Sequence, residues 1–66
     1  METDMYVMTK VVDADNGITI AYLDQEAFER SEATMAFMAK KVGHLYGCDE
    51  VEVHHPSGNI ESVRTK

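Results

Sequence analysis

The sequence predicts an α+β fold in which four strands form one mainly antiparallel sheet and a single helix covers one face, in the order β-β-α-β-β. Three observations predict it. A strand–turn–strand pattern lies at each end of the chain, one long amphipathic helical pattern lies between them, and 66 residues leave room for one core only. The whole chain, residues 1–66, is therefore expected to form a single small domain.

The first hairpin is predicted from two apolar segments and the turn between them. Residues 5–12 are rich in Val and Met on both faces, which favours a central strand. Residues 13–17 contain Asn16-Gly17, the strongest short hairpin signal, because both residues tolerate a positive φ. Residues 18–23 then alternate as a second strand.

The spacing of the aspartates in this turn also suggests a calcium-binding loop. Asp13 and Asp15 occupy the first and third positions of such a loop. However, the sixth position is Ile18 where the loop needs Gly, and the twelfth is Asp24 where it needs a bidentate Glu. We therefore interpret the segment as a hairpin turn.

The helix is expected to begin at Asp24, as its N-cap, and to run through residues 25–46. Its end is left open: Gly43 disfavours a helix interior, so the helix either stops there or continues to a cap at Gly47. One apolar stripe with spacings of three and four residues is expected to face the sheet. It consists of Phe28, Ser31, Met35, Met38, Val42 and Leu45.

The second hairpin follows the helix. Residues 51–55 alternate apolar and polar side chains, residues 56–59 form a Pro-containing turn, and residues 60–65 return as the last strand. Together these elements predict a core. It consists of Val7, Val11, Ile20, Phe28, Met35, Met38, Val42, Leu45, Val51, Val53 and Ile60.

The composition indicates the cellular compartment of the protein and argues against a membrane protein. Cys48 is the only cysteine, which excludes a disulfide within the chain and fits a reducing compartment. No apolar run approaches the roughly 20 residues of a membrane span, and the N-terminus lacks the features of a signal peptide. We therefore expect a cytoplasmic protein with no membrane partner.

The reactive side chains do not form a recognisable catalytic or metal-binding pattern. Cys48, His44, His54 and His55 are the zinc-type ligands, but their spacing lacks the close pairs of structural zinc sites. Neighbouring His54 and His55 point to opposite faces of a strand, so surface histidines at a strand end are the favoured interpretation, and Cys48 is expected to be a small buried residue after the helix. The sequence therefore predicts no enzyme, no metal and no cofactor.

The net negative charge of the protein arises entirely in its first half. The first 32 residues contain eight acidic and two basic side chains, whereas residues 33–66 contain four of each, and the net charge is −6. Such a surface repels nucleic acid and attracts basic proteins, although acidity also serves solubility alone. The candidate interaction residues of this acidic field are Asp13, Asp15, Asp24, Glu26 and Glu29.

Phe37 is the second candidate. At about 100° per residue it falls almost opposite the apolar stripe of the helix, next to the small residue Ala33. A single exposed aromatic residue is often without function. With small neighbours and a charged rim, however, it has the composition of an interface anchor, either for a second copy of the chain or for a different protein.

Four segments together carry a resemblance to a known class of protein: the opening strand METDMYVMTKVV, the DNG hairpin, the single long helix and the closing hairpin EVEVHHPSGNIESV. In size, acidity and layout, the chain resembles the small phage-encoded inhibitors of bacterial defence, above all anti-CRISPR proteins. The resemblance implies a non-enzymatic inhibitor in the host-cell cytoplasm that mimics DNA and occupies a nucleic-acid-binding surface.

The expected function is therefore that of an interaction module. It would dock its acidic surface onto a basic protein or nucleoprotein complex that handles nucleic acid, such as a CRISPR interference complex, and inhibit it without binding nucleic acid directly. The alternative is a small structural or regulatory domain that forms a homodimer through the Phe37 face of the helix or through a sheet edge.

Overall fold

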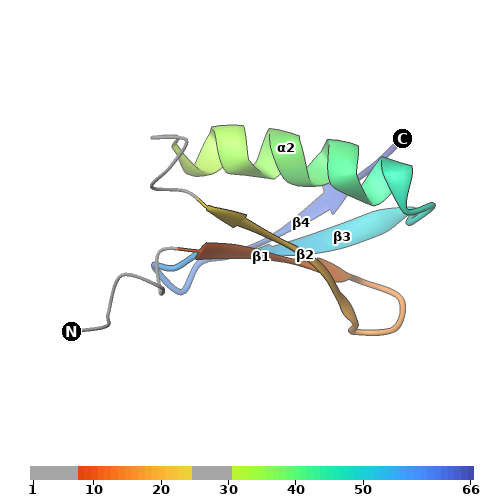
Figure 1. Cartoon of the computed structure of the whole chain (residues 1–66), viewed down its shortest axis with the longest axis horizontal. Helices are drawn as coiled ribbons and strands as arrows, with labels where there is room; N and C mark the ends of the chain where they lie inside the picture. The colour runs from red at the N-terminus through yellow and green to blue at the C-terminus, as the bar shows by residue number, and fades with distance from the viewer. Residues whose placement is uncertain (1–7, 25–30) are drawn as a thin grey trace.

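A computed structural model describes residues 8–24 and 31–66 of the chain. In chain order the elements are β1 (Met8–Asp13), β2 (Thr19–Asp24), α2 (Glu32–Leu45), β3 (Glu50–His54) and β4 (Ile60–Arg64). The four strands form one antiparallel sheet in the order β2-β1-β3-β4, and α2 lies across one face (Figure 1). The predicted α+β fold with the order β-β-α-β-β is confirmed, and β1 is a central strand.

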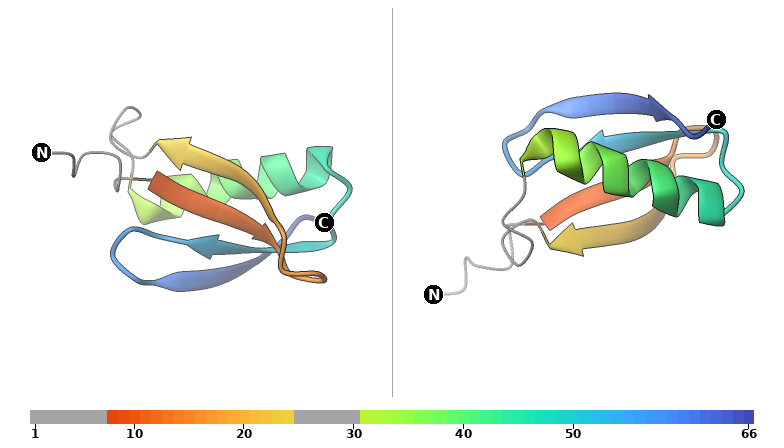
Figure 2. Two further views of the ribbon diagram at one scale, coloured as in Figure 1. Left: turned by 60° about the horizontal axis from the view of Figure 1, so that its bottom comes forward. Right: turned by 90° about the horizontal axis from the view of Figure 1, so that it is seen from above.

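The core lies between α2 and the helix-facing side of the sheet, and no element of the described residues covers the other side, which we call the open face (Figure 2). Strand register aligns the inward side chains: Val11 lies opposite Val53, and Val51 lies opposite Val63. Alternation along a strand then places the intervening residues on the open face. The buried apolar residues are Val11, Val12, Met35, Ala39, Cys48, Val51 and Val53.

The predicted core is confirmed in part. Of its members, Val11, Met35, Val51 and Val53 are buried, Ile20, Met38 and Val42 are half-buried, Leu45 and Ile60 are exposed, and Val7 and Phe28 lie outside the described residues. The prediction for Ile60 is wrong because β4 is an edge strand that turns this side chain to the open face. Leu45 is exposed because α2 is rotated about its axis, so that the residues it turns toward the sheet differ from the predicted stripe.

The rotation of α2 follows from small residues at its line of closest contact. Met35, Ala39 and Gly43, spaced four apart, are the buried residues of the helix. A Cβ atom built on Gly43 would lie 2.7 Å from a methyl group of Val51 and 2.9 Å from that of Thr65. Gly43 therefore allows the helix to approach β3 and the end of β4 closely, and its role is packing rather than termination.

The start of α2 differs from the prediction. Asp24 is not the N-cap; it is the last residue of β2, opposite Met8. The N-cap is Ser31, whose hydroxyl accepts a hydrogen bond from the Thr34 N–H at 3.3 Å. The predicted helical residues 25–30 lie outside the described part of the chain.

The end of α2 is a Schellman motif. The Gly47 N–H donates to the His44 carbonyl at 3.1 Å, and the Cys48 N–H donates to the Gly43 carbonyl at 2.9 Å. Gly47 has a φ of 76°, which a residue with a Cβ rarely adopts. Of the two predicted ends, the one at Gly47 is confirmed, and Cys48 is buried as expected.

The DADNG segment forms the turn between β1 and β2. A side-chain oxygen of Asp13 accepts the Asp15 N–H at 2.9 Å, and that of Asn16 accepts the Ile18 N–H at 2.9 Å. Gly17, with a φ of 76°, donates its N–H to the Asp13 carbonyl at 2.8 Å. The predicted turn is confirmed, and the Asp13 carboxylate stabilises it by accepting a backbone hydrogen bond.

Candidate interaction surfaces

The outer face of α2 carries large apolar side chains that the fold leaves exposed. Phe37 is 58% exposed and Leu45 is 81% exposed, although the helix buries Ala39 and Gly43 on its other side. Ala33 lies exposed one turn before Phe37. We use the name "outer face of α2" for five residues: Phe37, Lys40, Lys41, His44 and Leu45.

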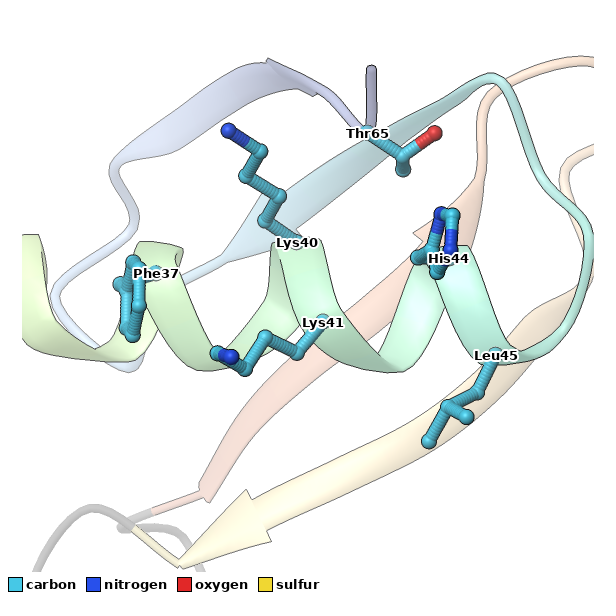
Figure 3. A pocket seen from close by; sticks show the side chains of 6 residues that line it. All are labelled: Phe37, Lys40, Lys41, His44, Leu45 and Thr65. Atoms are coloured by element: carbon cyan, nitrogen blue, oxygen red, sulfur yellow. The ribbon is translucent and has the colours of Figure 1, made fainter.

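These five side chains and Thr65 line an open hollow of about 580 Å³ (Figure 3). Lys40 and His44 project on the side of Thr65, at the end of β4, while Lys41 and Leu45 project on the opposite side of the helix. The hydroxyl of Thr65 is already used, because it donates to the Cys48 carbonyl at 2.6 Å. The hollow is thus a shallow depression between long side chains on a convex surface and not an enclosed binding cavity.

The outer face of α2 is positively charged. The Lys41 ammonium nitrogen lies 5.2 Å from the centroid of the Phe37 ring, which is a cation–π contact. Lys40 and Lys41 lie just before the last turn of the helix, which contains His44. Among residues 8–24 and 31–66 no carboxylate lines the hollow, so this part of the surface presents an aromatic ring with cationic neighbours.

The structure does not bring the predicted acidic residues to one place. Asp13 and Asp15 lie at the turn between β1 and β2, whereas Asp24 lies at the opposite end of β2. A strand of six residues spans about 17–20 Å, which exceeds the Debye length of about 8 Å at physiological salt. Glu26 and Glu29 lie outside the described residues.

A different acidic cluster forms at the turn. The Ala14 N–H donates to the carbonyl of Glu50 at 3.1 Å, so the turn lies against the start of β3. Four acidic residues therefore lie at this end of the sheet, and we call this region the acidic end: Asp13, Asp15, Asp49 and Glu50. Two described basic residues accompany it: Lys66, whose ammonium nitrogen lies 3.4 Å from Oδ1 of Asp49 on the exposed surface, and Arg64, which lies directly opposite Glu50 in the pairing of β3 with β4. Sequence analysis missed Asp49 and Glu50, because the second half of the chain is neutral overall.

Cys48 is buried next to the acidic end. Burial raises the pKa of its thiol, and a hydrogen bond to Asp13 and the negative charges of Asp13, Asp15 and Asp49 raise it further. A thiol with a raised pKa is a poor nucleophile at neutral pH. The environment of Cys48 therefore favours a structural role.

A polar cluster that sequence analysis missed ties the start of α2 to the turn between β3 and β4. Glu32, in the first turn of the helix, accepts hydrogen bonds from the Ser57 hydroxyl at 2.7 Å and the Asn59 side-chain amide at 3.0 Å. The Asn59 and Ser57 hydrogen bonds lower the pKa of Glu32, with a smaller contribution from the charge of His55. The charged carboxylate is therefore the form that holds the helix to the turn.

His55 lies beneath this cluster. The prediction of a surface histidine is wrong for His55, because alternation along β3 places its side chain on the helix-facing side of the sheet, where it is fully buried. Its Nε2 lies 2.8 Å from Oε1 of Glu61, and its buried Nδ1 has no hydrogen-bond partner within the described part of the chain. His54 points to the opposite face, as predicted, and contacts Glu52 at 3.2 Å.

Comparison with known proteins finds no family model, no curated protein and no solved structure that matches the chain. Within residues 8–24 and 31–66, no three or more His, Cys, Asp or Glu side chains are placed to hold a metal ion. No helix in this part of the chain has both the length and the apolar character required to cross a bilayer.

Proposed function

We propose that this protein is a non-enzymatic protein-interaction module that docks through the outer face of α2. The proposal rests on one observation: Phe37 and Leu45 are exposed on one side of the helix and are flanked by Lys40 and Lys41. The partner surface that fits this face is apolar at its centre and carries carboxylates at its rim.

The energetics of interfaces support this assignment. Aromatic residues surrounded by charged residues supply much of the affinity of many interfaces, because burying the ring removes a large apolar area from water. The lysines contribute in two ways: their aliphatic stems extend the apolar surface, and their charges guide an acidic partner. A partner that buries Phe37 therefore gains affinity without disturbing the core.

The charges also argue against a second copy as the partner on this face. A two-fold symmetric contact places the same surface patch on both sides of the interface. Lys40 and Lys41 of one copy would then lie near those of the other, with no carboxylate among the described residues that line the hollow. An acidic protein surface supplies carboxylates that pair with the lysines, whereas the outer face of a second copy brings further lysines.

Peptide display provides the test. The full chain is immobilised and used to select from a random peptide library, and the selected peptides are synthesised and titrated. We expect sequences that combine aromatic or aliphatic residues with Asp and Glu, and binding that weakens as salt is raised. Phe37→Ala and the double variant Lys40→Glu/Lys41→Glu are expected to weaken binding by at least about tenfold.

The matched control is Lys10→Glu, which makes the charge change of one of these two lysine substitutions on the open face of the sheet. It is expected to leave peptide affinity unchanged, since β1 separates it from the outer face of α2. Selected peptides that bind Phe37→Ala as tightly as the wild type would overturn the proposal.

A second candidate function is favoured by the acidic end. Four acidic residues lie there, against two described basic residues, Lys66 and Arg64. This arrangement supports docking onto a basic protein that handles nucleic acid and inhibition of that protein by mimicry of DNA phosphates, as anti-CRISPR proteins do. In this function the acidic end replaces the predicted acidic field as the docking surface.

The same selection distinguishes the two functions. If the acidic end is the docking surface, the selected peptides will be rich in Lys and Arg. Their binding will then be lost in the variant Asp13→Asn/Asp15→Asn/Asp49→Asn/Glu50→Gln and kept in Phe37→Ala. The amide substitution at Asp13 retains the side-chain oxygen that accepts the Asp15 N–H, so the turn is expected to persist.

A further inference from the structure

Strand β4 forms an edge of the sheet, and its outward hydrogen-bonding groups can be assigned from the register. The His55 N–H donates to the Asn59 carbonyl at 2.9 Å, and the Thr65 N–H donates to the Asp49 carbonyl at 3.0 Å. Hydrogen-bonded pairs alternate along an antiparallel ladder. The pairs Val53–Glu61 and Val51–Val63 therefore exchange the bonds between β3 and β4.

It follows that the remaining residues of β4 direct their backbone groups away from β3. These residues are Ile60, Ser62 and Arg64, and each presents one N–H and one carbonyl to the outer edge. Their side chains are exposed on the open face of the sheet, with Ile60 at 56%. Such a row of backbone groups is a template for a further strand.

The two edges of the sheet differ in this respect. At the β2 edge the register with β1 shifts between Val11 and Val12, and Ile20 has no directly opposite residue. A bulge of this kind bends an edge and disfavours pairing with another strand. The register of β4 with β3 is unbroken over five pairs, and β4 contains no proline, so β4 is the edge suited to pairing.

We propose that β4 pairs with β4 of a second copy, antiparallel and centred on Ser62, to give a dimer with one continuous eight-stranded sheet. In this register Ile60 lies opposite Arg64 of the second copy, and Ser62 lies opposite Ser62. All three outward-facing residues then exchange backbone hydrogen bonds across the two-fold axis. This proposal is independent of the docking function of α2.

The side chains favour this register over its neighbours. With the centre at Ser62, Glu61 faces Val63 of the second copy, so no like charges oppose each other, and Ile60 packs along the aliphatic stem of Arg64. With the centre at Glu61, two carboxylates would lie directly opposite each other, which destabilises a pair of strands. With the centre at Val63, only two of the outward-facing residues of β4 find partners within the strand.

The test measures the oligomeric state of the full chain together with the exchange of individual amides. Sedimentation from about 5 μM to about 500 μM is expected to show a monomer–dimer equilibrium. Over the same range the amides of Ile60, Ser62 and Arg64 are expected to become protected from hydrogen exchange as the concentration rises. The amides of Glu61 and Val63 are expected to be protected throughout, because β3 accepts their hydrogen bonds.

The diagnostic variant is Ser62→Lys, which places two ammonium groups opposite each other across the two-fold axis. It is expected to remain monomeric over the whole range with an unchanged circular-dichroism spectrum, because Ser62 is exposed in the monomer. The matched control is Tyr22→Lys, at an exposed position of the β2 edge, which is expected to dimerise like the wild type.

Three results would overturn the proposal. The first is a wild-type chain that stays monomeric at every concentration. The second is a dimer that persists in Ser62→Lys, and the third is a dimer in which the three outward amides exchange as fast as in the monomer. The last two would place the interface on another surface.

Discussion

The two faces of α2 differ in the size of the residues along their length. The face toward the sheet is centred on Ala39 and Gly43, whereas the outer face exposes Phe37 and Leu45. Both faces contain apolar residues, so hydrophobicity alone does not decide which of them is buried. The side that allows the closest approach to the sheet is the side that packs, because close contact maximises dispersion contacts and excludes voids.

This difference separates residues needed for folding from residues available for function. Met35 and Gly43 contact the sheet, and their substitution acts on stability. Phe37 lies near Lys41 on the surface, and its substitution is expected to change the affinity for a partner that binds there. Comparing matched substitutions on the two faces therefore tests the division directly.

The largest effect is expected from truncation of Met35. Met35 is fully buried, and Met35→Ala is expected to lower the free energy of unfolding by about 2–5 kcal/mol. Phe37→Ala removes a larger side chain from the same helix, yet it is expected to change stability by less than about 0.5 kcal/mol because the ring is exposed. Urea unfolding followed by circular dichroism measures both. Equal losses in the two variants would contradict the division between the faces.

The next effect concerns the close contact at Gly43. Gly43→Leu improves helix propensity, but its Cβ alone would lie within 3 Å of methyl groups of Val51 and Thr65. We expect a net loss of about 1–3 kcal/mol through overpacking. The matched control is Ala33→Leu, at an exposed position one turn before Phe37, where stability should change by less than about 0.5 kcal/mol. An unchanged melting temperature for Gly43→Leu would show that α2 moves away from the sheet without cost.

The fold could be predicted from the sequence because its signals are local. The Asn16-Gly17 turn, the alternation in residues 51–55 and the helical periodicity each depend on neighbouring residues, and together they predict the order of the elements. The contact face of α2 could not be predicted in the same way. A stripe of large apolar residues predicts burial of Leu45. In the structure the helix instead buries the line of residues through Gly43, because the helix and the sheet approach most closely there.

The candidate surfaces were less predictable, because they join segments that are distant in sequence. The exposure of Phe37 follows from helical periodicity, and the structure confirms it. The acidic end depends on the pairing of β1 with β3, which brings Glu50 next to the turn that holds Asp15. Neither half of the chain contains a local signal for that pairing, so only the tertiary structure identifies these carboxylates as neighbours.

A smaller effect is expected from substitution of the N-cap residue of α2, Ser31. Ser31→Ala removes the acceptor for the Thr34 N–H and is expected to cost about 1 kcal/mol. Ser31→Asp retains an acceptor and adds a negative charge at the positive end of the helix dipole, so its stability should equal or exceed that of the wild type. Thermal unfolding of the three proteins gives the comparison. A loss in Ser31→Asp equal to that in Ser31→Ala would contradict the assignment of the cap.

The smallest effect is the pH dependence of the contact between Glu32 and the turn. The lowered pKa of Glu32 means that the folded state favours the carboxylate. Its contribution to stability is therefore complete above the unfolded pKa of 4.5 and is lost as the pH falls through the lower folded value. The difference in urea midpoint between the wild type and Glu32→Gln should be constant from about pH 7 to pH 5 and should shrink at lower pH.

Other titrating groups are shared by the wild type and Glu32→Gln, so their effects largely cancel in this difference. Asn59→Ala removes the hydrogen bond that contributes most to lowering the pKa of Glu32. In the Asn59→Ala background the pH-dependent part of the difference should therefore be reduced. A difference that stays constant down to pH 2 would show that the carboxylate does not hold the helix to the turn. Among the described residues, the hydrogen bond from the Thr34 N–H to the Ser31 hydroxyl would then remain as the side-chain contact that stabilises the start of α2.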